Sequence, residues 1–195
     1  MNKRVFLEQE HKATGFKVFL IPLQEVHIKH LIKLAQDPSL IDLVGWNTFF
    51  ELDDTEQFIQ AISAYALPYS RPSQPLVLGV YLEPEELPIG YVALKGLNMD
   101  LFTAEIAVAI LDKKCRNKGY GKLALNRLIR YAFDELRIQT IAAAILLSNK
   151  KSTNMVKNLG FVVRQIMYHS WSLPNGNLVD MLWMELTKQT WISLK

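Results

Sequence analysis

The chain has 195 residues, of which 50% are hydrophobic and 21% are charged, and its formal net charge is +3. This length suits a single domain over residues 1–195, which buries roughly 70% of the surface of its unfolded chain. The small net charge does not indicate a nucleic-acid partner, and the longest uncharged apolar run, residues 141–147, is too short to cross a membrane. A single cysteine and an N-terminus (MNKRVFLEQEHK) without an apolar signal segment predict a cytoplasmic protein.

The N-terminal half of the chain predicts strands and helices in a mixed order. A strand over residues 16–21 ends at Pro22, and a helix follows over residues 24–36. Asp54 is suited to cap a second helix that runs to about Ala66. After a proline-rich loop over residues 68–75, two strands are predicted at residues 76–82 and 89–97, joined by an acidic turn.

The C-terminal half continues this pattern. Its predicted elements are a strand at 103–111, a helix at 122–136, a strand at 139–147, a helix that begins near Asn149, and two strands around the turn 174–177. This order predicts one α/β (α+β) domain. We expect a mixed, largely antiparallel twisted sheet of about seven strands, flanked by about four helices.

Residues 116–121 (RNKGYG) form a basic, glycine-containing turn between a predicted strand and a predicted helix. Glycines allow the backbone to curl with its N–H groups turned inward, and a helix N-terminus adds partial positive charge. Between residues 113 and 130 the chain has seven basic residues and no acid: Lys113, Lys114, Arg116, Lys118, Lys122, Arg127 and Arg130. The turn therefore predicts a phosphate-binding site, although some of these side chains are expected only to face solvent.

Two nucleotide-binding motifs fit this turn poorly. The chain contains no Gly-x4-Gly-Lys-Ser/Thr, which the P-loop requires. Gly119-x-Gly121-x-x-Ala124 matches a loose dinucleotide pattern, but that pattern needs a carboxylate at the end of the next strand. The strand at 139–147 ends instead in Ser148 and Asn149.

The pattern Arg116-x-x-Gly119-x-Gly121 resembles the acetyl-coenzyme A pyrophosphate loop of the GNAT acetyltransferase superfamily. Asn149-x-x-Ser152, followed by Leu159-Gly160-Phe161, resembles the helix that closes in Gly-Phe before the next strand in that family. The match covers a core region of residues 88–186. The ending, with Asn175-Gly176, Val179-Asp180 and Trp191, looks most like the RimJ/RimL-type branch.

The resemblance implies an N-acetyltransferase that uses acetyl-CoA as cosubstrate and needs no metal. It implies that Asn149 contacts the pantetheine amides and that residues 109–111 pair with the pantetheine arm through their main chain. The residues that the resemblance assigns to acetyl-CoA are Ala109, Ile110, Leu111, Arg116, Asn117, Lys118, Gly119, Tyr120, Gly121 and Asn149. Asn149 is equally suited to capping the helix that follows it.

Acetyl transfer requires a neutral amine, so the site needs a proton acceptor. Glu105, eleven residues before Arg116, is the candidate general base, because several branches of the family carry an acid there. The alternative is a structural Glu that pairs with a nearby Lys. Many members supply an acidic Tyr seven residues after the Asn, but Val156 stands there in this chain, and Ser152 is the candidate acid or else a helix cap.

The remaining polar residues give weaker signals. His11, His27, His30 and His169 show no metal-ligand spacing, and Cys115 is expected to be a packed neighbour of the loop. Tyr168 and Trp171 lie on a late predicted strand where a substrate could pass, but aromatic strand residues usually belong to the core. Six acidic residues in predicted loops and at a helix start would favour a cationic acceptor, although solvated acidic loops are commoner: Asp53, Asp54, Glu56, Glu83, Glu85 and Glu86.

The acceptor is expected to be the amine of a protein N-terminus or of a small molecule, with no nucleic-acid or membrane partner and a monomeric or homodimeric protein. A non-catalytic acyl-CoA-binding or regulatory domain is the alternative, because the usual Tyr is absent.

Overall fold

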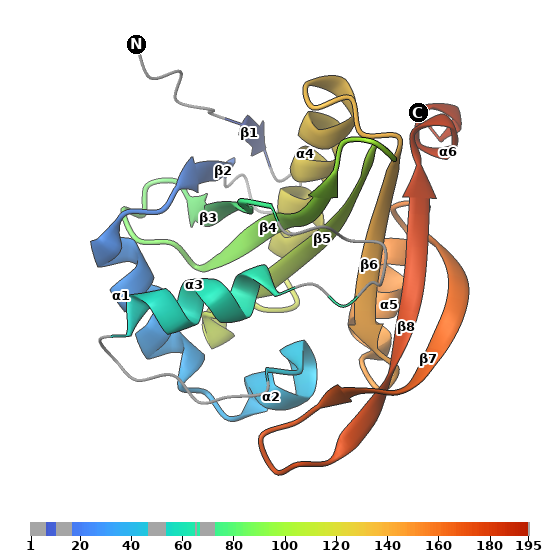
Figure 1. Ribbon diagram of the computed structural model, residues 1–195. Helices are drawn as coiled ribbons and strands as arrows, with labels where there is room; N and C mark the ends of the chain where they lie inside the picture. Colours follow the sequence, from blue (N-terminus) through green and yellow to red (C-terminus); the bar gives the residue numbers. More distant parts are fainter. Residues whose placement is uncertain (1–6, 11–16, 47–53, 65, 67–72, 195) are drawn as a thin grey trace.

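The structure is a computed structural model that describes residues 7–10, 17–46, 54–64, 66 and 73–194 (Figure 1). Its strands are β1 (Leu7–Glu10), β2 (Lys17–Pro22), β3 (Leu76–Leu82), β4 (Gly90–Asn98), β5 (Thr103–Ile110), β6 (Thr140–Leu146), β7 (Val162–Ser172) and β8 (Leu178–Thr187). Its helices are α1 (Glu25–Ala35), α2 (Ser39–Val44), α3 (Thr55–Ser63), α4 (Tyr120–Asp134), α5 (Lys150–Lys157) and α6 (Lys188–Ser193), with a 3-10 turn η1 (Lys113–Cys115).

The strands form one sheet in the order β1-β2-β3-β4-β5-β6-β8-β7. Every neighbouring pair is antiparallel except β5 and β6, which run parallel. Parallel neighbours need a long crossover, and α4 supplies it. The expected mixed, largely antiparallel sheet in an α/β domain is thereby confirmed.

Two hydrophobic cores lie on the two faces of this sheet. Helices α1, α2 and α3 cover one face, and α4 and α5 cover the other (Figure 1). Alternation along β5 divides its side chains between the cores, since successive strand residues point to opposite faces. Ile106 packs toward α4, whereas Ala109 and the following Leu111 pack toward α1–α3.

The structure adds elements that the sequence pattern does not reveal. These are the edge strand β1, the short helix α2 and the C-terminal helix α6, so the sheet has eight strands and the described residues form six α-helices. Helices of six residues are too short to show a 3.6-residue period. The strand β1 (LEQE) has no apolar alternation.

Two predicted boundaries shift for physical reasons. Helix α4 begins at Tyr120 instead of residue 122, because Gly119 adopts a left-handed conformation with φ of 86° immediately before it. Helix α3 ends at Ser63 instead of Ala66, where Ala64 becomes extended with ψ of 135°. Phe16 and residues 68–72, which belong to predicted elements, lie outside the described residues.

Gly90 is the position where β4 and β5 come closest to steric conflict. A Cβ added there would lie 2.1 Å from the carbonyl oxygen of Ala109. We predict that Gly90→Ala lowers the free energy of unfolding by about 2–3 kcal/mol, because backbone must move to admit the methyl group. Urea denaturation measures the change.

The matched control is Gly121→Ala, in which the added Cβ would meet its nearest atom, Cγ1 of Ile110, at 3.5 Å. This is an ordinary contact, and Ala suits a helix, so stability should change by less than about 1 kcal/mol. Equal losses in the two variants would contradict the proposed close approach of β4 and β5.

Candidate active site

The two parallel strands β5 and β6 separate soon after they meet. Their pairing covers only Thr103 with Thr140, Ala104 with Ile141, and Glu105 with Ala142. Beyond Glu105, β5 continues to Ile110 and β6 to Leu146 without pairing to each other, while their outer edges stay bonded to β4 and β8. Strand main-chain groups that face this gap lack a strand partner, so the gap presents hydrogen-bonding groups to a ligand.

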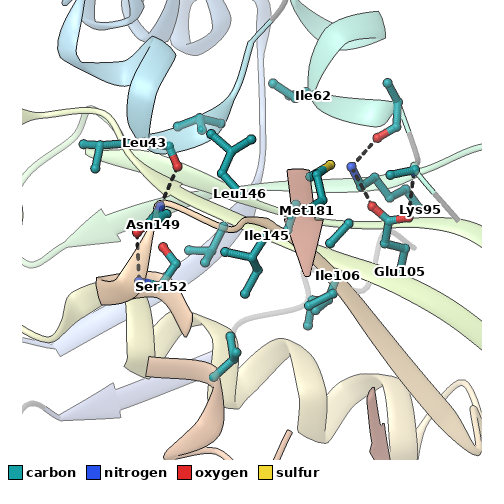
Figure 2. Close-up of a pocket in the computed structure, with 18 of the residues that line it drawn as sticks. Leu43, Ile62, Lys95, Glu105, Ile106, Ile145, Leu146, Asn149, Ser152 and Met181 are labelled. Carbon is teal, nitrogen blue, oxygen red and sulfur yellow. Dashed lines mark hydrogen bonds and ion pairs between the residues drawn. The ribbon is translucent and has the colours of Figure 1, made fainter. Parts of the chain in front are cut away.

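A cleft of about 870 Å³, part of it open to solvent, occupies this gap (Figure 2). Ile106, Ala107 and Val108 of β5 line one wall, and residues 143–146 of β6 line the opposite wall. Helices α2 and α3 contribute further apolar side chains, among them Leu43 and Ile62. The polar and charged side chains among its described lining residues are Lys95, Glu105, Asn149 and Ser152, apart from the indoles of Trp46 and Trp171 and the phenol of Tyr91.

The glycine turn lies beside the cleft, at the start of α4. Gly121 faces Ile110 and Val108 of β5 and Met155 of α5. Asn117 and Gly119 both have positive φ angles, 61° and 86°, which curl the backbone of the turn. Among the described residues, no side chain caps the N-terminus of α4, and its first turn holds no acidic residue. The predicted anion site therefore has a helix N-terminus that is left open for a ligand.

The side chains of the turn point in different directions. Asn117 and Lys118 are exposed, and Oδ1 of Asn117 accepts a hydrogen bond from Nζ of Lys151 at 3.3 Å. Tyr120 is buried in the core beneath α4. The sequence placed Tyr120 among the acetyl-CoA residues, and the structure gives its ring a packing role.

Arg116 holds neighbouring protein segments together. Its Nε donates to the carbonyl of Ile110 at 2.9 Å, and one terminal nitrogen donates to the carbonyl of Leu111 at 2.6 Å. The other terminal nitrogen donates to Asp37 at 2.9 Å and to the hydroxyl of Ser39 at 3.0 Å. Hydrogen bonds from Ser39, and then the guanidinium of Arg116, lower the pKa of Asp37. Both terminal nitrogens and Nε of the guanidinium thus have partners inside the protein.

The main chain of residues 109–111 is already partly engaged. The carbonyls of Ile110 and Leu111 accept from Arg116, and the N–H of Leu111 donates to Ile89 at 2.9 Å. These main-chain groups of residues 110 and 111 are therefore already occupied within the protein.

Asn149 caps α5, as the alternative interpretation of this residue proposed. Its Oδ1 accepts from the N–H of Ser152 at 3.0 Å, and its Nδ2 donates to the carbonyl of Leu43 at 2.6 Å. Ser152 lies beside it and also lines the cleft (Figure 2). Val156 lines the cleft as well, so an apolar side chain occupies the position where the family often has Tyr.

Glu105 forms a buried ion pair at the other end of the cleft (Figure 2). The carboxylate, in a residue only 2% exposed, lies 3.3 Å from Nζ of Lys95, which β4 places directly opposite. Its second oxygen accepts from the N–H of Ala66 at 2.9 Å, and Lys95 also donates to the carbonyl of Ala64. Sequence reasoning foresaw a lysine partner for Glu105 but did not identify Lys95, because strand register was not available.

Other candidates from the sequence lie away from the cleft. Cys115 donates to Asp112, and burial raises the pKa of its thiol, so it is not an activated nucleophile. Asp54 caps α3, and Glu83, Glu85 and Glu86 line a separate hollow with His27 and Tyr81. Asp53 lies outside the described residues.

Tyr168 and Trp171, the two candidates on β7, differ in whether they reach the cleft. Tyr168 is 68% exposed, whereas Trp171 lines the cleft and donates from its indole N–H to the carbonyl of Gly45. Across the described ranges, no cluster of three His, Cys, Asp or Glu side chains could hold a metal, and no helix is long and apolar enough to span a membrane.

Comparison with known proteins identifies the family. Residues 17–162 match the model of the acetyltransferase (GNAT) domain, so the chain belongs to this family. It is 30% identical over 106 residues to YdaF of Bacillus subtilis (strain 168), a candidate ribosomal N-acetyltransferase, covering 52% of this chain and 55% of YdaF. It is 31% identical over 88 residues to the N-acetyltransferase 9-like protein of Caenorhabditis elegans, covering 42% of this chain and 43% of that protein. The chain thus spans about half the length of these relatives.

Solved structures share the fold at low sequence identity. Spermidine N-acetyltransferase from Vibrio cholerae, in complex with CoA and spermine, superimposes with a TM-score of 0.74 at 19% identity, covering 90% of this chain and 98% of that one. A candidate acetyltransferase from T. thermophilus gives a TM-score of 0.76 at 18% identity, covering 100% of this chain and 95% of that one.

The contacts of Arg116 lead to a stability prediction. In Arg116→Met the two carbonyls at the end of β5 lose their donor, which costs about 1–3 kcal/mol for each carbonyl that stays buried. We expect the melting temperature to fall by several degrees, as measured by calorimetry. Arg130→Met makes the same chemical change at an exposed position of α4 and should leave the melting temperature unchanged. An unchanged melting temperature in Arg116→Met would show that these hydrogen bonds of Arg116 do not stabilise the fold.

Proposed function

We propose that this protein transfers the acetyl group of acetyl-CoA to a primary amine, by direct attack of the amine in a ternary complex. The observation that carries the proposal is the gap between β5 and β6, which begins beside Glu105 and leads toward the uncapped N-terminus of α4. An extended polar chain with an anionic end fits such a site, because strand edges offer hydrogen bonds and helix N-termini bind phosphate.

The turn supports coenzyme binding mainly through its backbone. The N–H groups of residues 119–121 lie at the N-terminus of α4. Gly121 has no side chain, which leaves space between this helix end and the side chains of Val108 and Ile110. The exposed side chains of Lys113, Lys114 and Lys118 add positive charge around the turn, which attracts the phosphates of the coenzyme. The pantetheine arm then follows the free edge of β5, with Asn149 at the opposite wall.

The chemistry needs a neutral nucleophile. Deprotonating a lysine-like amine at pH 7 costs roughly 4.6 kcal/mol, and an α-amine costs only about 1 to 1.4 kcal/mol. Glu105 is the carboxylate among the described residues that line the cleft, and we propose that it accepts this proton directly or through water. Ser152 lines the far end of the cleft, and we propose that it protonates the coenzyme thiolate, which is also able to leave unaided.

The acceptor is a protein N-terminus or a small-molecule amine. YdaF, named for ribosomal N-acetylation, supports the first possibility and a place in the RimJ/RimL-type branch. The spermidine enzyme supports the second. The lining of the cleft is largely apolar, with one lysine and one glutamate among its described residues, and this favours an amine with a single charge over a polyamine. The single Cys115 is consistent with action in the cytoplasm.

Turnover with a panel of amines tests the function. We expect calorimetry to show acetyl-CoA binding, and a thiol-reactive dye to show release of coenzyme A when peptides with free N-termini or small amines are added. Spermidine belongs in the panel as the polyamine. A protein that binds acetyl-CoA but releases no thiol with any amine would instead be the non-catalytic acyl-CoA-binding domain.

The role of Glu105 is tested by its pH profile. We predict that Glu105→Gln lowers turnover by about a hundredfold at low pH, and by much less at high pH where the acceptor amine is already neutral. Glu185→Gln is the control, since it makes the same change at an ion pair with Arg164 away from the cleft. An equal loss at every pH would assign Glu105 a packing role.

A further inference from the structure

Lys95 is the lysine among the described residues that line the cleft. It lies on β4 opposite Glu105, and its side chain is only 11% exposed. Its Nζ lies 3.3 Å from Oε1 of Glu105 and also donates to the carbonyl of Ala64 (Figure 2). The cleft thus contains an amine of its own, bonded to the carboxylate proposed as its base.

This arrangement has the components that acetyl transfer requires. A lysine ammonium must lose a proton before it can attack a carbonyl, and the proton acceptor has to lie within hydrogen-bond reach. Lys95 meets this geometric condition in the structure itself. An acceptor amine that used this carboxylate directly would have to share it with Lys95, whose Nζ already lies 3.3 Å from it.

We propose that Lys95 is a site of self-acetylation, a proposal that rests on the proposed function. Glu105 accepts one proton from the ammonium of Lys95, and the freed electron pair of Nζ attacks the carbonyl carbon of the acetyl thioester. A new N–C bond forms and the C–S bond breaks, with its electron pair leaving on sulfur. The second proton of the nitrogen passes to the thiolate, so that the products are acetyl-lysine and free coenzyme A.

The modification removes the charge of Lys95 and leaves Glu105 buried without its cation. Acetylation leaves one N–H on Nζ where the ammonium had three, so Lys95 can no longer serve both Glu105 and the carbonyl of Ala64 as it does in the structure. Because Lys95 and an external amine would use the same carboxylate, we expect self-acetylation to be fastest when acetyl-CoA is bound without an acceptor.

An exposed lysine elsewhere in the chain provides an internal control for an experiment that measures acetylation of Lys95. Non-enzymatic acetylation favours exposed lysines such as Lys29, whose side chain is 44% exposed, over the nearly buried Lys95. The full-length protein is incubated with acetyl-CoA alone, and peptide mass mapping follows each lysine with time. We expect Lys95 to be acetylated before Lys29, at a first-order rate that does not depend on protein concentration.

Variants connect the reaction to the cleft. Glu105→Gln should slow acetylation of Lys95 by about a hundredfold, as expected for loss of a general base. It should leave the rate at Lys29 unchanged. Lys29→Arg should leave the rate at Lys95 unchanged, and Lys95→Arg should abolish the modified peptide. Melting curves verify that each variant is folded.

The outcomes separate this proposal from the proposed function. If the protein binds acetyl-CoA and acetylates an added amine while Lys95 stays unmodified, self-acetylation is wrong and the proposed function stands. The proposal is also overturned if the exposed Lys29 is acetylated faster than the buried Lys95, or if Glu105→Gln leaves the rate at Lys95 unchanged. If the protein neither binds acetyl-CoA nor releases thiol, both proposals fail.

Discussion

The separation of β5 from β6 is the constraint on which the site depends. Backbone N–H and C=O groups of a strand need partners, and a strand inside a sheet normally finds them on both neighbours. Here β6 is bonded along its length to β8, and β5 to β4, so neither strand is able to turn toward the other after Glu105. The gap therefore results from the way β5 pairs with β4 and β6 pairs with β8, and a ligand can complete the missing hydrogen bonds.

The short helix α2 is held against this gap by three side chains from distant parts of the chain. Arg116 bonds to Asp37 and Ser39 at its beginning, while Asn149 and Trp171 bond to the carbonyls of Leu43 and Gly45 at its end. Six residues cannot form a stable helix alone, so these contacts and apolar packing keep it in place. Arg116 and Asn149, which motif matching assigns to the coenzyme, thus also position the wall of the cleft.

The ion pair of Lys95 and Glu105 places two buried charges at one end of the cleft. Removing one partner of such a pair is costly because it leaves an uncompensated charge in the protein interior. The same pair also bonds to the backbone of Ala64 and Ala66, just after α3 ends at Ser63. The carboxylate that we propose as the general base is thus held by Lys95 and by the N–H of Ala66 at one end of a largely apolar cleft.

The sequence by itself determined the order of the long elements, the glycine turn at the start of α4 and the family to which the chain belongs. These features depend on local periodicity, backbone freedom at glycine and motif spacing, all of which are visible along the chain. Tertiary structure alone decided that Arg116 turns inward, that Lys95 faces Glu105 and that α2 lines the cleft. Each of these follows from strand register or from contacts between residues far apart in the chain, and neither leaves a periodic signal in the sequence.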